Sequence, residues 1–328
     1  MTIDLIGGGS LGLLYGGKLA AAGIHVRIWC RSAEQAAKLS SEGISIRNTE
    51  GDLEVSAKPE DFTAGVIEEF AGGWMQEPGE WIFLMTKQKD AVEVCSQSAG
   101  RLASASDKLS GGLQPGIVCF QNGYGHMEVI DKMLPGWPLF VAVTTEGAKR
   151  LSQSEVLHAG AGTTWMGRYG KEHAGGNRAI QPEEGVKMLQ KAGFSAELSN
   201  DIDSRVYRKL LINAVINPLT ALWNIPNGEL LSSQRRLSVM RMLLDEALEV
   251  YDACGIPWDK DIWDQIVGVC ASTSGNTSSM LKDVQEGVPT EVEWINGSIA
   301  SLARKAGMRA LNHELVTGLI QGLTIREE

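Results

Sequence analysis

The chain has 328 residues, of which 43% are hydrophobic and 21% charged, and its formal net charge is −10 with a pI of about 5.1. This length is sufficient for about two domains, each with a core of its own. The negative charge disfavours nucleic acid or an anionic membrane as a partner, and no apolar run is long enough to span a bilayer.

The cysteines and histidines indicate a reducing compartment and no metal. Five cysteines, an odd number without a Cys-x-x-Cys pair, are typical of reduced thiols in a cytoplasm. The five histidines form no clustered ligand motif, so a metal site is not expected. Because an apolar strand is predicted from residue 3, there is no room for a signal peptide, and we expect a cytoplasmic protein.

A βαβ unit is predicted at the start of the chain, with strands at 3–6 and 25–29 and a helix at 13–22. The first strand leads into a glycine-rich segment, Gly7-Gly8-Gly9-Ser10-Leu11-Gly12. In such a motif the first glycine allows a tight turn, the second lets the backbone approach a pyrophosphate, and the third lets the helix pack on the strand. The segment therefore predicts a dinucleotide site, with a purely structural turn as the alternative.

The end of the second strand indicates the type of dinucleotide. An NAD site usually has an acid there, whereas an NADP site has an arginine nearby. Here the strand ends in Trp29-Cys30-Arg31-Ser32. Arg31 can pair with a 2′-phosphate and Ser32 can add a hydrogen bond, so NADP is predicted. A solvated surface charge at Arg31 is the alternative.

An α/β fold with a parallel, doubly wound Rossmann-type sheet is predicted over residues 1–199, because strands alternate with helices. Further strands are expected at 81–86, 116–121 and 139–144, with shorter ones at the far edge of the sheet at 155–158, 163–167 and 196–198. Residues 99–115 and 169–180 are expected to be polar loops.

Residues 200–328 are predicted to form a second, all-helical domain. Apolar residues recur there at three- and four-residue spacing, and no strand pattern is present. The predicted helices cover 205–222, 232–254, 259–285, 291–306 and 311–323.

Lys87 and Asn122 each follow a predicted strand, at the edge where open α/β sheets bind ligands. Lys87 can reach a phosphate or a ribose, and Asn122 can bond a nicotinamide ribose or a substrate. Each is equally compatible with ordinary loop chemistry, because Asn-Gly is a common turn pair.

A polar stripe marks the first helix of the second domain. Lys209, Asn213 and Asn217 are four residues apart and lie on one face among Leu, Ile, Ala and Val. Buried ammonium and amide groups need partners, so the stripe predicts a site for a small polar ligand, with a solvated face as the alternative. Pro218 is expected to interrupt this helix near Asn217.

Near residue 290 a helix start is predicted, because Thr290 and Glu293 fit a capping box. Glu291 would then fall in the first turn. Taken alone, it is best explained as compensation of the helix dipole.

These motifs together resemble the ketopantoate reductase (2-dehydropantoate 2-reductase) family over nearly the whole chain. The resemblance is strongest at Arg208-Lys209-Leu210 through Asn217-Pro218-Leu219-Thr220-Ala221, at Pro226-Asn227-Gly228-Glu229-Leu230, at Ser278-Ser279-Met280-Leu281, and at Thr290-Glu291 with Ile295-Asn296-Gly297. It implies a helical domain like that of 6-phosphogluconate dehydrogenases. It further implies that Lys209 is the general acid, with Glu291 supporting it.

The resemblance also assigns the other site residues. Asn122, Asn213, Asn217, Asn227 and Ser279 match substrate-binding positions, and Gly7, Gly9, Ser10, Leu11, Gly12, Arg31, Lys87 and Asn122 match cofactor-binding positions. The segments 60–80 and 99–115 are less typical of the family and could reshape the rim of the site.

The implied reaction is NADPH-dependent reduction of 2-dehydropantoate to (R)-pantoate, in the biosynthesis of pantothenate and coenzyme A. The partner is then a small 2-oxo acid, without nucleic acid, membrane or metal, and the protein is a monomer or a homodimer. Two alternatives remain: a reductase of the same architecture acting on another branched 2-oxo acid, because motifs are reused, and a non-catalytic NADP-binding sensor.

Overall fold

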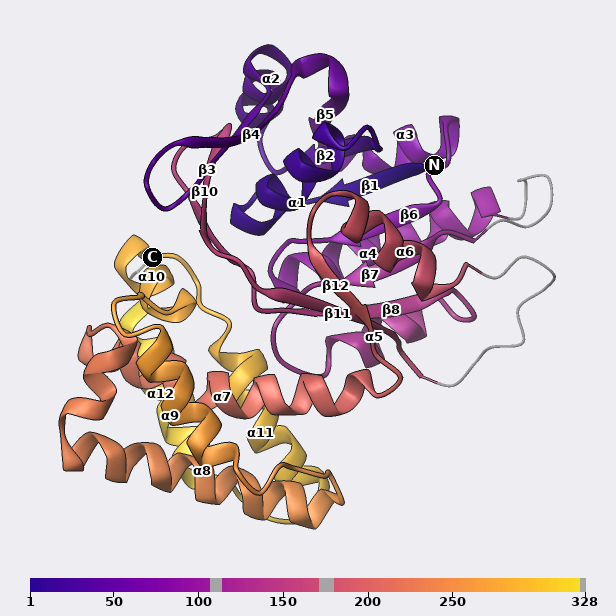
Figure 1. Ribbon diagram of the computed structural model, residues 1–328. Coiled ribbons are helices and arrows are strands. Elements are labelled where there is room, and N and C mark those ends of the chain that lie inside the picture. Colours follow the sequence, from indigo (N-terminus) through magenta and orange to yellow (C-terminus); the bar gives the residue numbers. More distant parts are fainter. Residues whose placement is uncertain (107–113, 171–179, 325–328) are drawn as a thin grey trace. The chain divides into compact units, whose positions relative to one another are not determined.

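The computed structural model describes residues 1–106, 114–170 and 180–324, which form two compact units (Figure 1). The first unit contains Met1–Gln121 and His126–Ile202. The second contains Asn122–Gly125 and the chain from Asp203 onward. All strands of the described residues belong to the first unit, and the second is helical.

The larger sheet of the first unit has the predicted Rossmann-type architecture. In spatial order its strands are β12 (Ser195–Leu198), β11 (Thr163–Arg168), β8 (Leu139–Thr144), β7 (Gly116–Cys119), β6 (Trp81–Leu84), β1 (Thr2–Ile6), β2 (His25–Cys30) and β5 (Phe62–Val66). Neighbours are parallel except β11, which runs antiparallel to β8. The strand order reverses at β1, and open α/β sheets bind ligands beside such a reversal, at the carboxyl ends of the strands.

A second, four-stranded sheet was not predicted. Its strands are β4 (Leu53–Ala57), β3 (Ile44–Arg47), β10 (Glu155–Gly160) and β9 (Gly147–Arg150). The placement of 155–158 at the edge of the main sheet was therefore wrong, because β10 pairs with β3 and β9 instead. These strands have four to six residues, and only β3 buries alternate side chains. Strands this short with so little regular burial are hard to separate from loops by sequence alone.

Helix α1 (Ser10–Ala21) packs against both sheets, which explains its composition. Residues from Gly12 to Ala20 are buried without interruption, as expected of a helix that is covered on all sides. A Cβ atom added at Gly17 would lie 2.9 Å from Ile44 of the small sheet, and one at Gly16 would lie 2.9 Å from Ile28 of the large sheet. The glycines thus let both sheets approach the helix backbone.

The remaining helices of the first unit lie between its strands in sequence. They are α2 (Ala33–Glu42), α3 (Phe70–Gln76), α4 (Gln88–Ser106), α5 (His126–Met133) and α6 (Pro182–Lys191), with 3₁₀ turns η1 (Pro59–Asp61) and η2 (Ile67–Glu69). The loop predicted at 99–115 was wrong in part, because α4 continues to Ser106. Residues 107–113, and 171–179 of the other predicted loop, lie outside the described residues.

The second unit consists of helices packed around one core. They are α7 (Ile202–Trp223), η3 (Asn227–Ser232), α8 (Gln234–Cys254), α9 (Ile262–Ser272), α10 (Ser279–Glu286), α11 (Val292–Lys305) and α12 (Leu311–Thr324). The single helix predicted at 259–285 is two helices. The separating segment is rich in Ser, Thr, Gly and Asn, and the Ser278 hydroxyl accepts from the main-chain N–H of Leu281, which caps α10.

Pro218 does not interrupt α7, contrary to the sequence prediction. The helix runs unbroken from Ile202 to Trp223. Proline has no N–H for the carbonyl four residues earlier, that of Ala214. The side-chain Nδ2 of Asn296 on α11, itself fully buried, donates to this carbonyl at 2.9 Å. A neighbouring helix thus supplies the hydrogen bond that proline cannot make.

We expect Asn296→Ala to destabilise the fold, because it leaves the Ala214 carbonyl buried without this donor. The free energy of unfolding should fall by about 1–3 kcal/mol, the cost of an unsatisfied buried polar group. Denaturant unfolding followed by circular dichroism measures it. Asn276→Ala is the matched control, since the side chain of Asn276 is exposed and its described hydrogen bonds use main-chain atoms. Equal unfolding midpoints for the two variants would contradict this role of Asn296.

Candidate active site

The backbone of the glycine-rich loop requires glycine at two of the three predicted positions, Gly7 and Gly12. Gly7 has a φ of +115°, which favours glycine. A Cβ at Gly12 would lie 1.8 Å from the carbonyl oxygen of Gly7, so only glycine lets the helix start this close to the turn. A Cβ at Gly9 would meet no atom within 4 Å. The Gly9 backbone therefore faces open space in this unit, as an approaching phosphate requires.

The N-terminus of α1 is suited to an anion. No side chain caps it, and its first turn contains no acidic residue. Its first N–H groups and the positive end of the helix dipole are therefore available to a phosphate. The same turn begins with Ser10 and Leu11, both half-buried.

Gln35 and Arg150, which the sequence analysis did not single out, hold this loop in place. Gln35 on α2 donates through Nε2 to the Gly8 carbonyl at 2.7 Å and to the Gln153 carbonyl at 3.0 Å. The hydroxyl of Ser10 accepts from the main-chain N–H of Arg150 on β9 at 3.1 Å. The small sheet thus supports the glycine-rich turn. Long-range contacts of this kind leave no local pattern in the sequence.

Arg31 follows β2 as predicted and is exposed, but it has a partner. Its guanidinium forms an ion pair with the carboxylate of Asp90 in the first turn of α4. The hydroxyl of Ser32 accepts from the main-chain N–H of Gln35 and so caps α2. The second predicted phosphate contact is therefore already used for helix capping.

Buried polar atoms with no hydrogen-bond partner in the described part of the chain lie at the carboxyl ends of β6 and β7. They are Oγ1 of Thr86 and Oε1 of Gln121. The Gln121 amide also donates to the carbonyls of Leu84 and Thr86, both at 2.9 Å, which ties the two strand ends together. Lys87 follows Thr86 and is half-buried. The Thr86 hydroxyl and the Gln121 amide oxygen could hydrogen-bond the amide and ribose groups of a dinucleotide.

Within the second unit, the fold brings together three of the predicted residues. Lys209 lies on α7 and is half-buried. Burial lowers the pKa of its ammonium to about 8, and the nearby carboxylate of Glu291 acts in the opposite direction. Glu291 also accepts from Nδ2 of Asn122 at 3.3 Å. An ammonium, a carboxylate and an amide from distant parts of the sequence thus form one cluster.

The loop that carries Asn122 is anchored in the helical unit by its neighbour Tyr124. The main-chain N–H of Tyr124 donates to the Trp294 carbonyl at 3.2 Å, and the Ser298 hydroxyl donates to the Tyr124 carbonyl at 2.9 Å. The Tyr124 ring also lies 5.2 Å from that of Tyr207, two residues before Lys209. These contacts fix Asn122 beside Glu291.

The capping box predicted at residue 290 was wrong. Helix α11 begins at Val292 with Glu291 as its N-cap residue, and the Glu291 side chain makes no capping hydrogen bond. Thr290 accepts from the main-chain N–H of Val292 at 3.4 Å, and Glu293 pairs with Gln321 instead of closing a box. The Glu291 side chain therefore does not cap α11, and its carboxylate accepts from Asn122.

The asparagines of the polar stripe both lie on α7 and are at least half-buried. Asn217 is 7% exposed and Asn213 is half-buried. Neither side-chain amide has a hydrogen-bond partner among the residues that the structure describes. Each amide offers donors and an acceptor that a polar ligand could use.

Asn227 and the Ser278–Ser279 pair complete the polar surroundings of α7. Asn227 donates to the Thr273 hydroxyl at 2.9 Å, and its buried Oδ1 has no partner in the described part of the chain. Ser278 is buried and lies 2.7 Å from the hydroxyl of Thr220. Ser279, the predicted substrate contact, is exposed at the start of α10.

If the stripe binds substrate, Asn213→Ala and Asn217→Ala should raise the Michaelis constant about 10- to 150-fold while the turnover number changes little, since one hydrogen bond to a charged group contributes about 1.5–3 kcal/mol to binding. Steady-state kinetics on the folded fraction provides the measurement. Asn276→Ala, an exposed asparagine of the same unit whose described hydrogen bonds use main-chain atoms, is the control. A lower melting temperature with unchanged kinetics would show that the amides serve packing alone.

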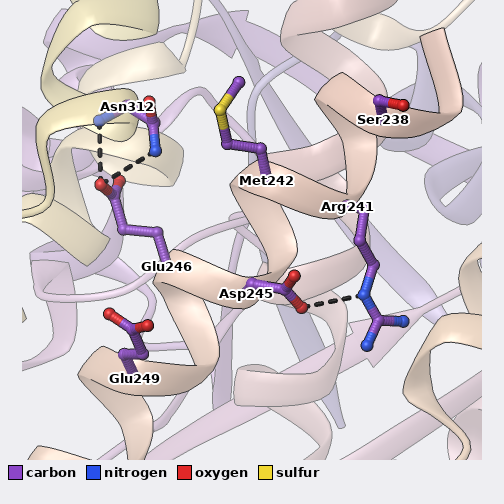
Figure 2. Close-up of a pocket in the computed structure, with 7 residues that line it drawn as sticks. All are labelled: Ser238, Arg241, Met242, Asp245, Glu246, Glu249 and Asn312. Atoms are coloured by element: carbon purple, nitrogen blue, oxygen red, sulfur yellow. Dashed lines mark hydrogen bonds and ion pairs between the residues drawn. The ribbon is translucent and has the colours of Figure 1, made fainter. Parts of the chain in front are cut away.

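A pocket on the surface of α8 and the start of α12 is separate from the candidate site residues (Figure 2). It is lined by Ser238, Arg241, Met242, Asp245, Glu246, Glu249 and Asn312. Arg241 pairs with Asp245 at 2.9 Å, and Glu246 accepts from the main-chain N–H of Asn312 at 3.0 Å (Figure 2). Asp245 is thus used for an ion pair and Glu246 for capping α12, and no predicted site residue lines the pocket. The described residues contain no cluster of ligands that could hold a metal.

The fold and these groups define a class of protein. A Rossmann-type unit with an open glycine-rich turn occurs together with a helical unit in which an ammonium of lowered pKa lies beside a carboxylate. This combination of units and groups is typical of a two-domain oxidoreductase.

Comparison of the sequence with models of known protein families identifies the kind of oxidoreductase. The model described as "Ketopantoate reductase PanE/ApbA" matches residues 3–171, and that described as "Ketopantoate reductase PanE/ApbA C terminal" matches residues 201–324. The chain therefore belongs to the ketopantoate reductase family, and it is an oxidoreductase.

Relatives and solved structures agree with this assignment. The chain is 29% identical to the 2-dehydropantoate 2-reductases of Archaeoglobus fulgidus and Bacillus subtilis, in each case over 98% of this chain and 97% of the relative. The crystal structure of a probable 2-dehydropantoate 2-reductase from Bacillus subtilis matches with a TM-score of 0.77 at 28% identity, covering 98% of this chain and all of the other.

The fold is also shared with D-mandelate dehydrogenase, solved with NADH and anilino(oxo)acetate. That structure has a TM-score of 0.81 at 20% identity and covers 99% of this chain and 98% of the other. Among the described residues, no helix is both long and apolar enough to cross a membrane.

Proposed function

We propose that this protein reduces 2-dehydropantoate to (R)-pantoate with NADPH, a step in making pantothenate and coenzyme A. Residues 1–199 would bind the dinucleotide and residues 200–328 the substrate. The observation that carries the proposal is the half-buried Lys209 with its lowered pKa beside Glu291, in a chain whose curated relatives are named 2-dehydropantoate 2-reductases.

Lys209 is the proposed proton donor. The cofactor, when bound, supplies the hydride. As negative charge develops on the substrate's carbonyl oxygen, the Lys209 ammonium stabilises it and transfers a proton to that oxygen. A pKa of about 8 keeps the lysine protonated at neutral pH and makes its proton easier to release than that of an ordinary lysine. Glu291 keeps the ammonium charged and orients it.

The neutral amides are the proposed substrate contacts. Asn213 and Asn217 lie one and two helical turns beyond Lys209 on the same face of α7. They can hydrogen-bond the carboxylate and hydroxyl of 2-dehydropantoate without adding charge beside the reacting carbonyl. Asn122 joins them through its contact with Glu291, and Asn227 and Ser279 are the remaining proposed contacts.

The dinucleotide is proposed to bind at Gly7, Gly9, Ser10, Leu11 and Gly12, with Lys87 at a phosphate or ribose and Asn122 at the nicotinamide ribose. Arg31 is the proposed contact to the 2′-phosphate. The uncapped α1 terminus and the open space beside Gly9 support this placement.

We expect Arg31→Ala to weaken NADPH binding about tenfold, the lower end for a hydrogen bond to a charged group, because solvent screens this exposed side chain. NADH binding should change less than twofold, since NADH has no 2′-phosphate. Fluorescence titration of both dinucleotides measures the two dissociation constants. Arg47→Ala, an arginine of the small sheet, is the control. Equal weakening of both dinucleotides would contradict a 2′-phosphate contact.

A second candidate is reduction of another 2-oxo acid. The shared fold of D-mandelate dehydrogenase shows that this architecture is not confined to one substrate. NADPH oxidation with 2-dehydropantoate, compared with branched, straight-chain and aromatic 2-oxo acids, tests both candidates. The highest kcat/KM for 2-dehydropantoate supports the proposal, and a higher value for another acid favours the second candidate. Turnover of none of them would point to a binding protein without catalysis.

A further inference from the structure

The ion pair between Arg31 and Asp90 lies where the two nicotinamide dinucleotides differ. Arg31 directly follows β2, the position at which an acid marks NAD sites and an arginine marks NADP sites. Asp90 follows β6, and β1 separates these two strands in the sheet. The chain therefore presents both an arginine and an acid at this position. The arginine follows β2, and the acid comes from α4, the helix that follows β6.

Asp90 is the better fixed of the two partners. It is the third residue of α4, where the helix dipole favours a carboxylate. The main-chain N–H of Ala91 donates to the Lys87 carbonyl at 2.9 Å, and the adjacent Gln88 is fully buried. The side chain of Asp90 is 31% exposed, compared with 77% for that of Arg31. The helix start that carries Asp90 is thus held by contacts that do not involve Arg31.

This arrangement acts differently on the two dinucleotides. A 2′-phosphate must draw the Arg31 guanidinium away from Asp90 and then remain close to a like charge. A ribose 2′-hydroxyl meets no such repulsion, and the Asp90 carboxylate can accept its hydrogen bond, as the strand-end acid does in NAD sites.

We infer that Asp90 is a specificity-determining residue that limits the preference for NADPH created by Arg31, so that the site also accepts NADH. The inference rests on the proposed function, because it needs a dinucleotide at the glycine-rich turn. The presence of Arg31 alone predicts a preference for NADPH. The inference adds that this preference for NADPH over NADH becomes stronger when Asp90 is removed.

Adenosine 2′,5′-bisphosphate and 5′-AMP test the inference directly, since they differ only in the 2′-phosphate. Their dissociation constants, and those of NADPH and NADH, are measured by calorimetry at fixed ionic strength for the unmodified protein and for Asp90→Asn and Asp90→Ala. Glu34→Gln is the matched control, because Glu34 is exposed in the first turn of α2, three residues from Arg31, and has no ion pair among the described residues. Melting temperatures confirm that each variant is folded.

Both Asp90 variants should bind the bisphosphate and NADPH about 3- to 10-fold more tightly, while 5′-AMP and NADH bind equally well or more weakly. The Arg31→Ala background should reduce this gain, because the competition for the guanidinium is then absent. Unchanged or weaker binding of the bisphosphate relative to 5′-AMP would overturn the inference, as would an equal gain in Glu34→Gln. If neither dinucleotide bound the unmodified protein, the proposed function itself would fail, and the inference with it.

Discussion

Lys209→Ala should reduce the turnover number about 100- to 10,000-fold, the range for loss of a positioned general acid. NADPH binding should be retained, because the proposed dinucleotide contacts at the glycine-rich turn belong to the other unit. Steady-state kinetics with 2-dehydropantoate measures the loss, and fluorescence titration measures the retained affinity. More than about a tenth of the normal turnover would mean that the proton comes from another group.

Lys209→Arg separates the proton from the charge. Arginine keeps a positive charge, but its pKa is too high for it to release a proton in the reaction. We therefore expect Lys209→Arg to retain substrate binding while its turnover stays close to that of Lys209→Ala. Lys282→Ala, a half-buried lysine of α10 that pairs with Glu286, is the control for loss of a cation. Recovery of turnover in Lys209→Arg would show that charge stabilisation suffices without proton transfer.

The thermal stability of Lys209→Ala is a further check, because its sign differs from that of an ordinary core mutation. The pKa of Lys209 is lowered from 10.5 to about 8 in the folded protein. A lysine whose folded pKa is below its unfolded pKa opposes folding while it is protonated, which holds in full below about pH 8. Removing it should leave the melting temperature at pH 7 unchanged or raise it. A large fall would assign Lys209 a structural role.

Glu291→Gln should lower the turnover number about 10- to 100-fold with little change in melting temperature, equivalent to about 1.4–2.8 kcal/mol on the barrier. The substitution keeps the shape and the bond to Asn122 but removes the charge beside Lys209. The structure makes this test sharp, because the Glu291 side chain makes no capping hydrogen bond for α11. Full activity in Glu291→Gln would leave Glu291 with helix-dipole compensation only.

The pH profile gives Glu291 a second readout. Reduction requires the protonated lysine, so the rate should fall as pH rises through about 8. Because the Glu291 carboxylate raises the pKa of Lys209, Glu291→Gln should move this fall to lower pH. Glu293→Gln is the matched control, since Glu293 lies two residues away and pairs with Gln321. A profile unchanged in Glu291→Gln would show that the carboxylate does not act on the lysine.

Local patterns in the sequence determined much of the fold. The glycine-rich turn and its flanking strand and helix were predictable because tight turns need glycine and buried strands need apolar runs, and both constraints act within a few residues. The helical second half was predictable for the same reason, since three- and four-residue spacing is a local property. The small sheet was not, because strands such as β3 and β10 are short and take their stability from pairing more than a hundred residues apart.

In the candidate site, too, local features were predictable from the sequence and long-range contacts were not. Four-residue spacing was enough to place Lys209, Asn213 and Asn217 on one helical face. Only the tertiary structure decided what each polar group meets: Asn296 supplies the hydrogen bond that Pro218 removes from α7, Glu291 faces Asn122 instead of closing a capping box, and Asp90 reaches Arg31 from a different crossover. The physical reason is that hydrogen bonds and charge interactions act over a few ångströms in space, whereas the residues that make them are 59 to 169 positions apart in the chain.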